Sequence, residues 1–293
     1  MAGLEGHATH LPGVRRRDLG QHDIMASNLG DGFAIYPMVE EGEATGAVAG
    51  VYAQLLTRMP FVPSLFKSFA LCPQYLVLAY EQSAGVLDGN ELKTSGQELG
   101  ASMRDVVQPP EQEQVRQTLA AFVGPLGRML LLSSGLLLAL HGELDAPPAP
   151  GDAPAGRPVE PGQPAPSQWD APAPALYGAL RAALDTPLVN TIWRKLAAEG
   201  QLEQAWSALE PQVASSRSAA DALQDRSLTA ARSLPWTVVA SRDALVAAGI
   251  GDAAPGMAAV LDAYVKTLPR LLVLASSSTA EHPDHQESAD QSR

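Results

Sequence analysis

Histidine, which often carries catalysis or binds metals, is scarce in this sequence, and most of its histidines lie near the ends of the chain. Of the six histidines, only His141 falls within a helical body, at the end of an apolar run where a surface position at a helix terminus is expected. Histidine-based triads and histidine-containing metal sites need imidazoles that converge in the core, so the sequence argues against both. No phosphate-binding loop, G-x-S-x-G turn or H-E-x-x-H motif occurs. We therefore expect no metal and no cofactor.

Two twelve-residue segments of the chain are nearly the same. "MPFVPSLFKSFA" (59–70) and "TPLVNTIWRKLA" (186–197) align at an offset of 127 residues with three identities. A second pair, "LAAFVGPLGRMLLLSS" (119–134) and "LDAYVKTLPRLLVLAS" (261–276), aligns at an offset of 142 residues. The sequence therefore predicts a tandem duplication whose two halves pack as a pseudo-dimer.

A cleft between two such halves is a common place for a small-molecule pocket, mostly apolar with a few polar groups. If the first pair of segments lines the cleft, residues of one half face their counterparts in the other. The predicted pocket residues are Phe61, Pro63, Ser64, Val189, Asn190, Thr191 and Tyr264. The alternative is that these are ordinary helix-start residues, with Ser64, Asn190 and Thr191 acting as caps.

The chain divides into five parts, and its fold class is predicted to be all-α. The parts are a flexible N-terminal arm (1–35), a first helical repeat (36–145), a proline-rich linker (146–175), a second helical repeat (176–276) and a disordered tail (277–293). Apolar residues recur at spacings of three and four within the repeats, as in helices that bury one face. Helices are expected to begin at Pro60, at Pro73 and at the pair Pro109 and Pro110. The linker is a spacer or, alternatively, a proline-rich ligand for another protein.

Composition limits the partners and the compartment. The formal net charge of −12 argues against nucleic-acid and anionic-membrane partners, and the 46% hydrophobic content indicates a soluble globular protein. The single cysteine, Cys72, and the lack of a signal-peptide pattern favour the cytoplasm. Residues 119–140 are apolar enough to raise the question of a membrane span, but Gly124, Pro125 and Arg128 interrupt them, which favours a core helix. An oligomer is compatible with the sequence.

The layout of these features resembles the DehI-type (group I) 2-haloacid dehalogenases. The resemblance covers about residues 36–276 and rests on the repeats and on "PFVPSLFKSFALCPQYLVLAY" after "VYAQLLTRM". It implies an all-α pair of repeats and hydrolysis of short 2-halocarboxylic acids without a cofactor. In that family an aspartate shortly after the second-copy proline is the general base for a water that attacks the halogen-bearing carbon directly. An asparagine in the first half helps to hold that water, and aromatic residues near the first-copy proline shape the pocket.

Two positions depart from this pattern. Asn190 stands where the family has the aspartate, and Leu126 stands where it has the asparagine. A neutral amide cannot take a proton from water at neutral pH. Phe61 keeps the family's aromatic character, whereas Ser64 does not. The resemblance therefore implies a divergent or catalytically impaired homologue that binds a small carboxylic acid. The alternatives are an active dehalogenase whose base is displaced to Asp185, and a non-enzymatic interaction module.

A carboxylate ligand also needs cations or hydrogen-bond donors. Four basic residues stand at repeat-matched positions: Lys67, Arg194, Arg128 and Arg270. The alternative for each is a surface charge whose aliphatic stem packs against the protein.

Overall fold

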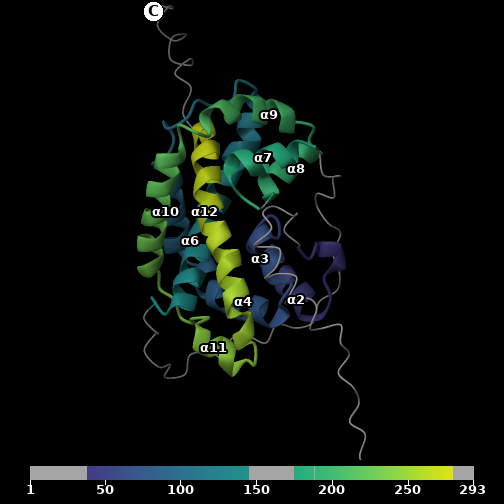
Figure 1. Ribbon diagram of the computed structural model, residues 1–293, viewed down its shortest axis with the longest axis vertical. Coiled ribbons are helices and arrows are strands. Elements are labelled where there is room, and N and C mark those ends of the chain that lie inside the picture. Colours follow the sequence, from purple (N-terminus) through teal and green to yellow (C-terminus); the bar gives the residue numbers. More distant parts are fainter. Residues whose placement is uncertain (1–37, 145–174, 188, 280–293) are drawn as a thin grey trace, which may run out of the picture.

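Two long helices, α6 (Glu113–His141) and α12 (Ala254–Ser276), run beside each other through the middle of the molecule (Figure 1). The computed structural model describes residues 38–144, 175–187 and 189–279. The predicted arm lies outside these residues, as do nearly all of the predicted linker and the tail from residue 280. The described residues form α-helices, short 3-10 helices and loops without a strand, so the predicted all-α fold class is confirmed.

Shorter helices surround the two long ones. α5 (Asn90–Ala101) packs on α6, and α10 (Arg217–Arg232) packs on both α6 and α12. The other α-helices are α2 (Gly46–Leu56), α3 (Ser64–Phe69), α4 (Pro73–Leu87), α7 (Leu176–Leu184), α8 (Thr191–Ala198), α9 (Leu202–Leu209) and α11 (Arg242–Ala247). The 3-10 helices are η1 (Glu41–Glu43), η2 (Glu210–Gln212), η3 (Gly251–Ala253) and η4 (Ser277–Thr279). Figure 1 shows α7, α8 and α9 beside one end of α12, and α2, α3 and α4 further along it.

Helix boundaries follow local backbone constraints. Pro73 opens α4 at its first turn, as predicted, because its missing N–H is not needed there. The helices after Pro60 and after Pro109 begin only at Ser64 and Glu113, which corrects the expected starts. In each case another proline follows, at Pro63 and Pro110, and a residue that precedes a proline is disfavoured in the helical conformation.

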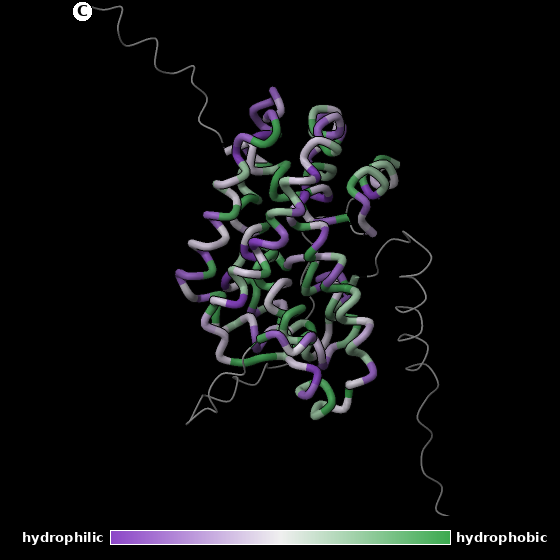
Figure 2. Tube along the Cα trace, turned by 60° about the vertical axis from the view of Figure 1, so that its left-hand side comes forward, coloured by the Kyte–Doolittle hydropathy of each residue, from purple (hydrophilic) through white to green (hydrophobic). Residues whose placement is uncertain are grey.

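The apolar segment at 119–140 belongs to one continuous helix, α6, which runs through Pro125. Among the described residues it is the one helix long and apolar enough to cross a membrane. However, 83% of its most apolar window is buried inside the fold, as in the core helix of a soluble protein. Figure 2 agrees, because hydrophobic stretches lie towards the middle of the bundle and hydrophilic ones are frequent on its outer helices.

The α5 and α6 helices touch backbone to backbone. A Cβ atom added to Gly127 would lie 2.3 Å from the carbonyl oxygen of Gly96, and one added to Gly96 would lie 3.0 Å from the backbone nitrogen of Arg128. Glycine at both positions therefore lets the two helices approach more closely than side chains allow. This contact fixes α5 against the helix that carries several of the residues discussed below.

Replacing Gly127 by alanine is expected to lower the free energy of unfolding by about 2 kcal/mol, because the new methyl group meets backbone that cannot move aside. Gly124→Ala is the matched control, since it lies in the same helix and its added Cβ would meet nothing within 4 Å. That control is expected to be neutral or slightly stabilising. Urea unfolding followed by tryptophan fluorescence measures both, and equal losses would contradict the close contact.

Candidate functional site

A small cavity lies where α3, α6, α8 and α12 meet. Its volume is about 30 Å³, which is room for about two water molecules. The lining residues are Phe61, Pro63, Ser64, Leu65, Phe122, Pro125, Leu126, Met129, Asn190, Thr191, Ile192, Tyr264 and Leu268. No charged side chain is among them. In the described part of the chain, no cluster of three or more His, Cys, Asp or Glu side chains that could hold a metal comes together.

The cavity is built from matched residues of the two predicted repeats. Five pairs of lining residues stand at the two repeat offsets: Pro63 and Asn190, Ser64 and Thr191, Leu65 and Ile192, Phe122 and Tyr264, and Leu126 and Leu268. A two-fold axis between similar halves would bring equivalent residues together in this way. The pairs agree with the predicted pseudo-dimer, which stays a prediction.

The first residues of α3 and α8 contact each other at the cavity wall. The hydroxyl oxygens of Ser64 and Thr191 are 2.7 Å apart and share a hydrogen bond. The backbone N–H of Thr191 also donates to the Ser64 hydroxyl at 3.1 Å. Ser64 thus satisfies the first N–H of a helix from the other half of the chain rather than capping its own helix. This contact joins α3 to α8.

Asn190 precedes α8, is only 4% exposed and lines the cavity. Its side chain does not cap α8, and its amide oxygen is buried without a hydrogen-bond partner. A buried polar atom left without a partner costs about 1–3 kcal/mol. The capping alternative therefore does not account for Asn190, and no hydrogen bond among the described residues satisfies its amide oxygen.

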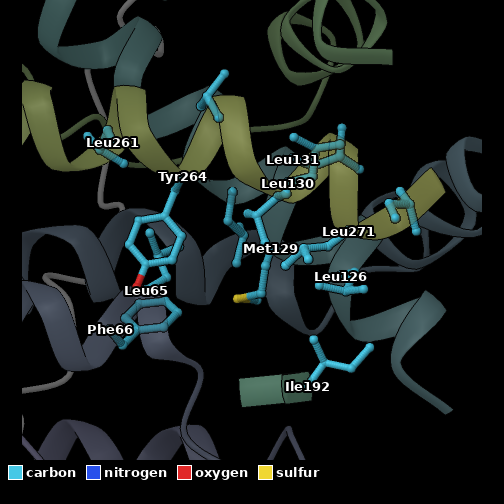
Figure 3. Close-up of a cluster of buried hydrophobic side chains, with 14 of the residues drawn as sticks. Leu65, Phe66, Leu126, Met129, Leu130, Leu131, Ile192, Leu261, Tyr264 and Leu271 are labelled. Carbon is cyan, nitrogen blue, oxygen red and sulfur yellow. The ribbon is translucent and has the colours of Figure 1, made fainter. Parts of the chain in front are cut away.

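Aromatic and flexible side chains close the remaining walls. Phe61 and Phe122 stack with ring centroids 5.2 Å apart. The hydroxyl of Tyr264 forms a buried hydrogen bond of 2.9 Å with Ser68 of α3. Figure 3 shows Met129 extending from α6 between Tyr264 on one side and Leu126 on the other. Because methionine is unbranched, Met129 can change rotamer and alter the cavity more easily than its neighbours can.

Comparisons with solved structures identify this architecture. A mutant D-2-haloacid dehalogenase in complex with D-2-CPA superposes with a TM-score of 0.70 at 18% identity, over 84% of this chain and 95% of that chain. The fold is that of the D-2-haloacid dehalogenases. A D-2-haloacid dehalogenase in complex with L-LA gives a TM-score of 0.67 at 18% identity, over 84% of this chain and 95% of that chain. A further D-2-haloacid dehalogenase mutant gives 0.69 at 20% identity, over 83% and 94%.

No protein-family model matches the sequence, and no curated protein matches it. The likeness to D-2-haloacid dehalogenases is therefore one of fold, as the sequence resemblance predicted.

Seven of the eight residues predicted for the site line the cavity of this dehalogenase fold. They are Asn190, Leu126, Phe61, Pro63, Ser64, Thr191 and Tyr264. Val189 is buried but is not a lining residue, contrary to expectation. It directly precedes Asn190 in an extended segment, where successive side chains point in opposite directions, so only one of the two faces the cavity.

Asp185, the alternative base, does not line the cavity. It ends α7 in a left-handed conformation with φ of 48°. Its side chain is 65% exposed and lies 3.7 Å from the guanidinium of Arg270. No aspartate or glutamate, Asp185 included, is among the described residues that line the cavity.

Six lining residues were not predicted: Leu65, Phe122, Pro125, Met129, Ile192 and Leu268. The second repeat alignment contains a signal for two of them, because Phe122 matches the predicted Tyr264 and Leu268 matches Leu126. Helical spacing contains a signal for Met129, which lies three residues after Leu126 and thus on the same face of α6.

None of the four repeat-matched cations lines the cavity. Arg270 donates to the backbone oxygens of Leu184 and, at 3.0 Å, of Asp185. The guanidinium of Arg128 has no hydrogen bond or ion pair among the described residues, and partial burial lowers its pKa. Lys67 is only 3% exposed, so the surface-charge alternative is wrong for this residue. Lys67 and Arg194 belong to a cluster of ion pairs beside the cavity wall.

Proposed function

We propose that this protein binds a short carboxylic acid in the cavity between α3, α6, α8 and α12, and that it does not hydrolyse 2-haloacids by activating a water molecule. The observation that carries the proposal is Asn190. Asn190 lines a cavity that has no carboxylate among its lining residues, and its amide oxygen is buried without a hydrogen-bond partner, in a fold shared with D-2-haloacid dehalogenases.

The chemistry of two lining residues argues against hydrolysis. In the dehalogenases that the sequence resembles, an aspartate and an asparagine are expected at the positions of Asn190 and Leu126. An amide does not act as a base near neutral pH, and a leucine side chain cannot hold a water molecule by hydrogen bonding. Loss of a general base alone typically lowers a rate by about 100- to 10,000-fold.

The polar groups that remain suit a carboxylic acid. Asn190 offers an amide group, and Ser64 and Thr191 add hydroxyls at the same wall. The other lining residues, among them Phe61 and Met129, are mostly apolar and suit a short alkyl chain. Since the cavity holds only about two water molecules, binding requires a rotamer change, for which Met129 is best suited.

Short carboxylic acids are expected to raise the melting temperature of the unmodified protein, whereas the matching amides are not. A ligand at about 100 times its dissociation constant adds about 2.7 kcal/mol of stability, which shifts the melting temperature by about 5–10 °C in a domain of this size. A thermal-shift series that pairs propionate with propionamide and 2-chloropropionate with its amide measures this effect.

Asn190→Leu is the matched control for binding, because it keeps a similar size and removes the polar group. This variant is expected to stay folded and to lose the acid-dependent shift. If no acid shifts the unmodified protein, the binding proposal fails. A halide assay on the same samples tests the second claim, because release of chloride by the unmodified protein would show that hydrolysis has been retained.

A further inference from the structure

A cluster of four charged side chains lies next to the cavity wall, and one carboxylate stands at its centre. Glu40 Oε2 is 2.8 Å from the ammonium of Lys67, and Glu40 Oε1 is 2.8 Å from the guanidinium of Arg194. Glu41 Oε2 lies 2.6 Å from the same ammonium. A single carboxylate therefore joins a cation of α3 to a cation of α8. These two cations stand at repeat-matched positions, separated by 127 residues.

The cluster continues the contact between α3 and α8. Lys67 lies three residues after Ser64 in α3, and Arg194 lies three residues after Thr191 in α8. Residues three apart on a helix lie on one face, so both cations stand one turn beyond the hydroxyl pair of Ser64 and Thr191. The contact between α3 and α8, called the seam below, thus has two layers. The first is the hydroxyl pair of Ser64 and Thr191, and the second is formed by Lys67, Arg194 and Glu40.

The segment that carries Glu40 is held against α3 by its backbone. The N–H of Val39 donates to the backbone oxygen of Lys67 at 3.1 Å, and the hydroxyl of Tyr52 donates to the backbone oxygen of Val39 at 2.7 Å. Burial, and then the negative charge of Glu41, raise the pKa of Tyr52, so this hydroxyl keeps its proton for that hydrogen bond. These bonds place the carboxylate of Glu40 between the two cations.

The seam needs an anion at this place. The ammonium of Lys67 is buried, with 4% of its side chain exposed, and the side chain of Arg194 is 17% exposed. Glu41 can balance only one of these charges, so without Glu40 the cluster would keep a net positive charge. Partly buried like charges close together repel each other strongly.

Glu40 behaves as a bound anion. Burial on its own would raise its pKa, but hydrogen bonds from Lys67 and Arg194, together with attraction to both cations, hold the pKa below the usual 4.5. Because the pKa of Glu40 is lowered in the folded state, its carboxylate contributes its full stabilisation above the usual pKa of 4.5. That stabilisation is lost as the pH falls through the lowered pKa.

We propose that Lys67 and Arg194 form a carboxylate-binding site separate from the cavity, and that Glu40 of the same chain occupies this site as an internal ligand. The class of ligand is a small carboxylate that can accept hydrogen bonds from an ammonium and a guanidinium at once. The site does not depend on whether the cavity itself binds an acid. It gives the protein an anion site beside the cavity that an external acid can enter only when Glu40 leaves.

Acetate is expected to rescue a Glu40→Ala variant, because acetate has the heavy atoms that this substitution removes. The variant alone is expected to melt about 5 °C below the unmodified protein, since both cations lose their shared partner and the pair is partly exposed. Acetate should recover at least half of that loss, whereas acetamide and sodium chloride at equal concentration should not. Thermal unfolding of each protein in the three solutes measures the effect.

Two matched variants separate a site from a general salt effect. Glu43→Ala removes an exposed carboxylate from η1, the short helix that Glu40 precedes. Glu43 accepts from the backbone N–H of Glu40 but contacts neither cation, so this variant should show no acetate-specific rescue. Adding Arg194→Met to Glu40→Ala should abolish the rescue. Equal recovery in acetate and acetamide, or undiminished rescue without Arg194, would overturn the proposal. If Glu40→Ala does not fold alone, the folded yield after refolding in acetate and in acetamide gives the same comparison, and equal yields would overturn it.

Discussion

A variant with Asn190→Asp and Leu126→Asn is expected to release halide from 2-chloropropionate at least about 100 times faster than the unmodified protein. Both positions line the cavity, so the new carboxylate and the new amide would face the same small space. The aspartate supplies a base for a water molecule, and the asparagine supplies a hydrogen bond that holds the water. A factor of about 100 is the lower end of what a general base contributes.

The expected rate depends on pH with a definite sign. An aspartate at position 190 would replace a side chain that is only 4% exposed and has apolar neighbours, so burial should raise the pKa of the new carboxyl. Only the ionised carboxyl can take a proton from water. The rate is therefore expected to rise with pH through that raised pKa, and the assay is best made at about pH 8–9.

Single variants show whether the two residues act together. Asn190→Asp alone lacks the residue that holds the water, and Leu126→Asn alone lacks the base, so each should fall well below the double variant. Adding Asp185→Asn to the double variant should leave the rate unchanged, because Asp185 does not line the cavity. A folded double variant that releases halide no faster than the unmodified protein would show that the cavity itself cannot accept the substrate.

The helical architecture and most of the cavity could be predicted because both depend on patterns that recur along the chain. Apolar spacing of three and four indicates helices whatever they pack against. The alignment of two similar segments predicted that Ser64 and Thr191 meet, and their hydroxyls are 2.7 Å apart. Cytoplasmic location and oligomeric state remain predictions, since neither depends on such a pattern.

The ion cluster could not be predicted because it depends on contacts that no local pattern encodes. Glu40 and Glu41 precede the first long helical pattern and match nothing in the second repeat. Their partners include Arg194, which is far away in the sequence. A lysine such as Lys67 is ordinarily exposed, so its burial becomes visible only when the surrounding elements are in place. The small volume of the cavity likewise depends on the rotamers of side chains such as Met129.

Replacing Lys67 by methionine is expected to lower the free energy of unfolding by about 3–5 kcal/mol, and by far more than the repeat-matched change Arg194→Met. Methionine keeps the length of the side chain and removes the ammonium that contacts Glu40 and Glu41. The Glu41 side chain is only 4% exposed, so its carboxylate stays buried without that ammonium. Removing one partner of a buried ion pair costs about this much.

Arg194→Met is the matched control, because its partner Glu40 is 24% exposed and keeps its contact with Lys67. That change is expected to cost about 1 kcal/mol, as for a pair near the surface. Urea unfolding followed by tryptophan fluorescence measures both variants. Adding Glu41→Gln to Lys67→Met should recover much of the loss, because the buried charge is then removed together with its partner. If Lys67→Met costs no more than Arg194→Met, burial does not set the strength of these pairs, and the two cations stabilise the seam equally.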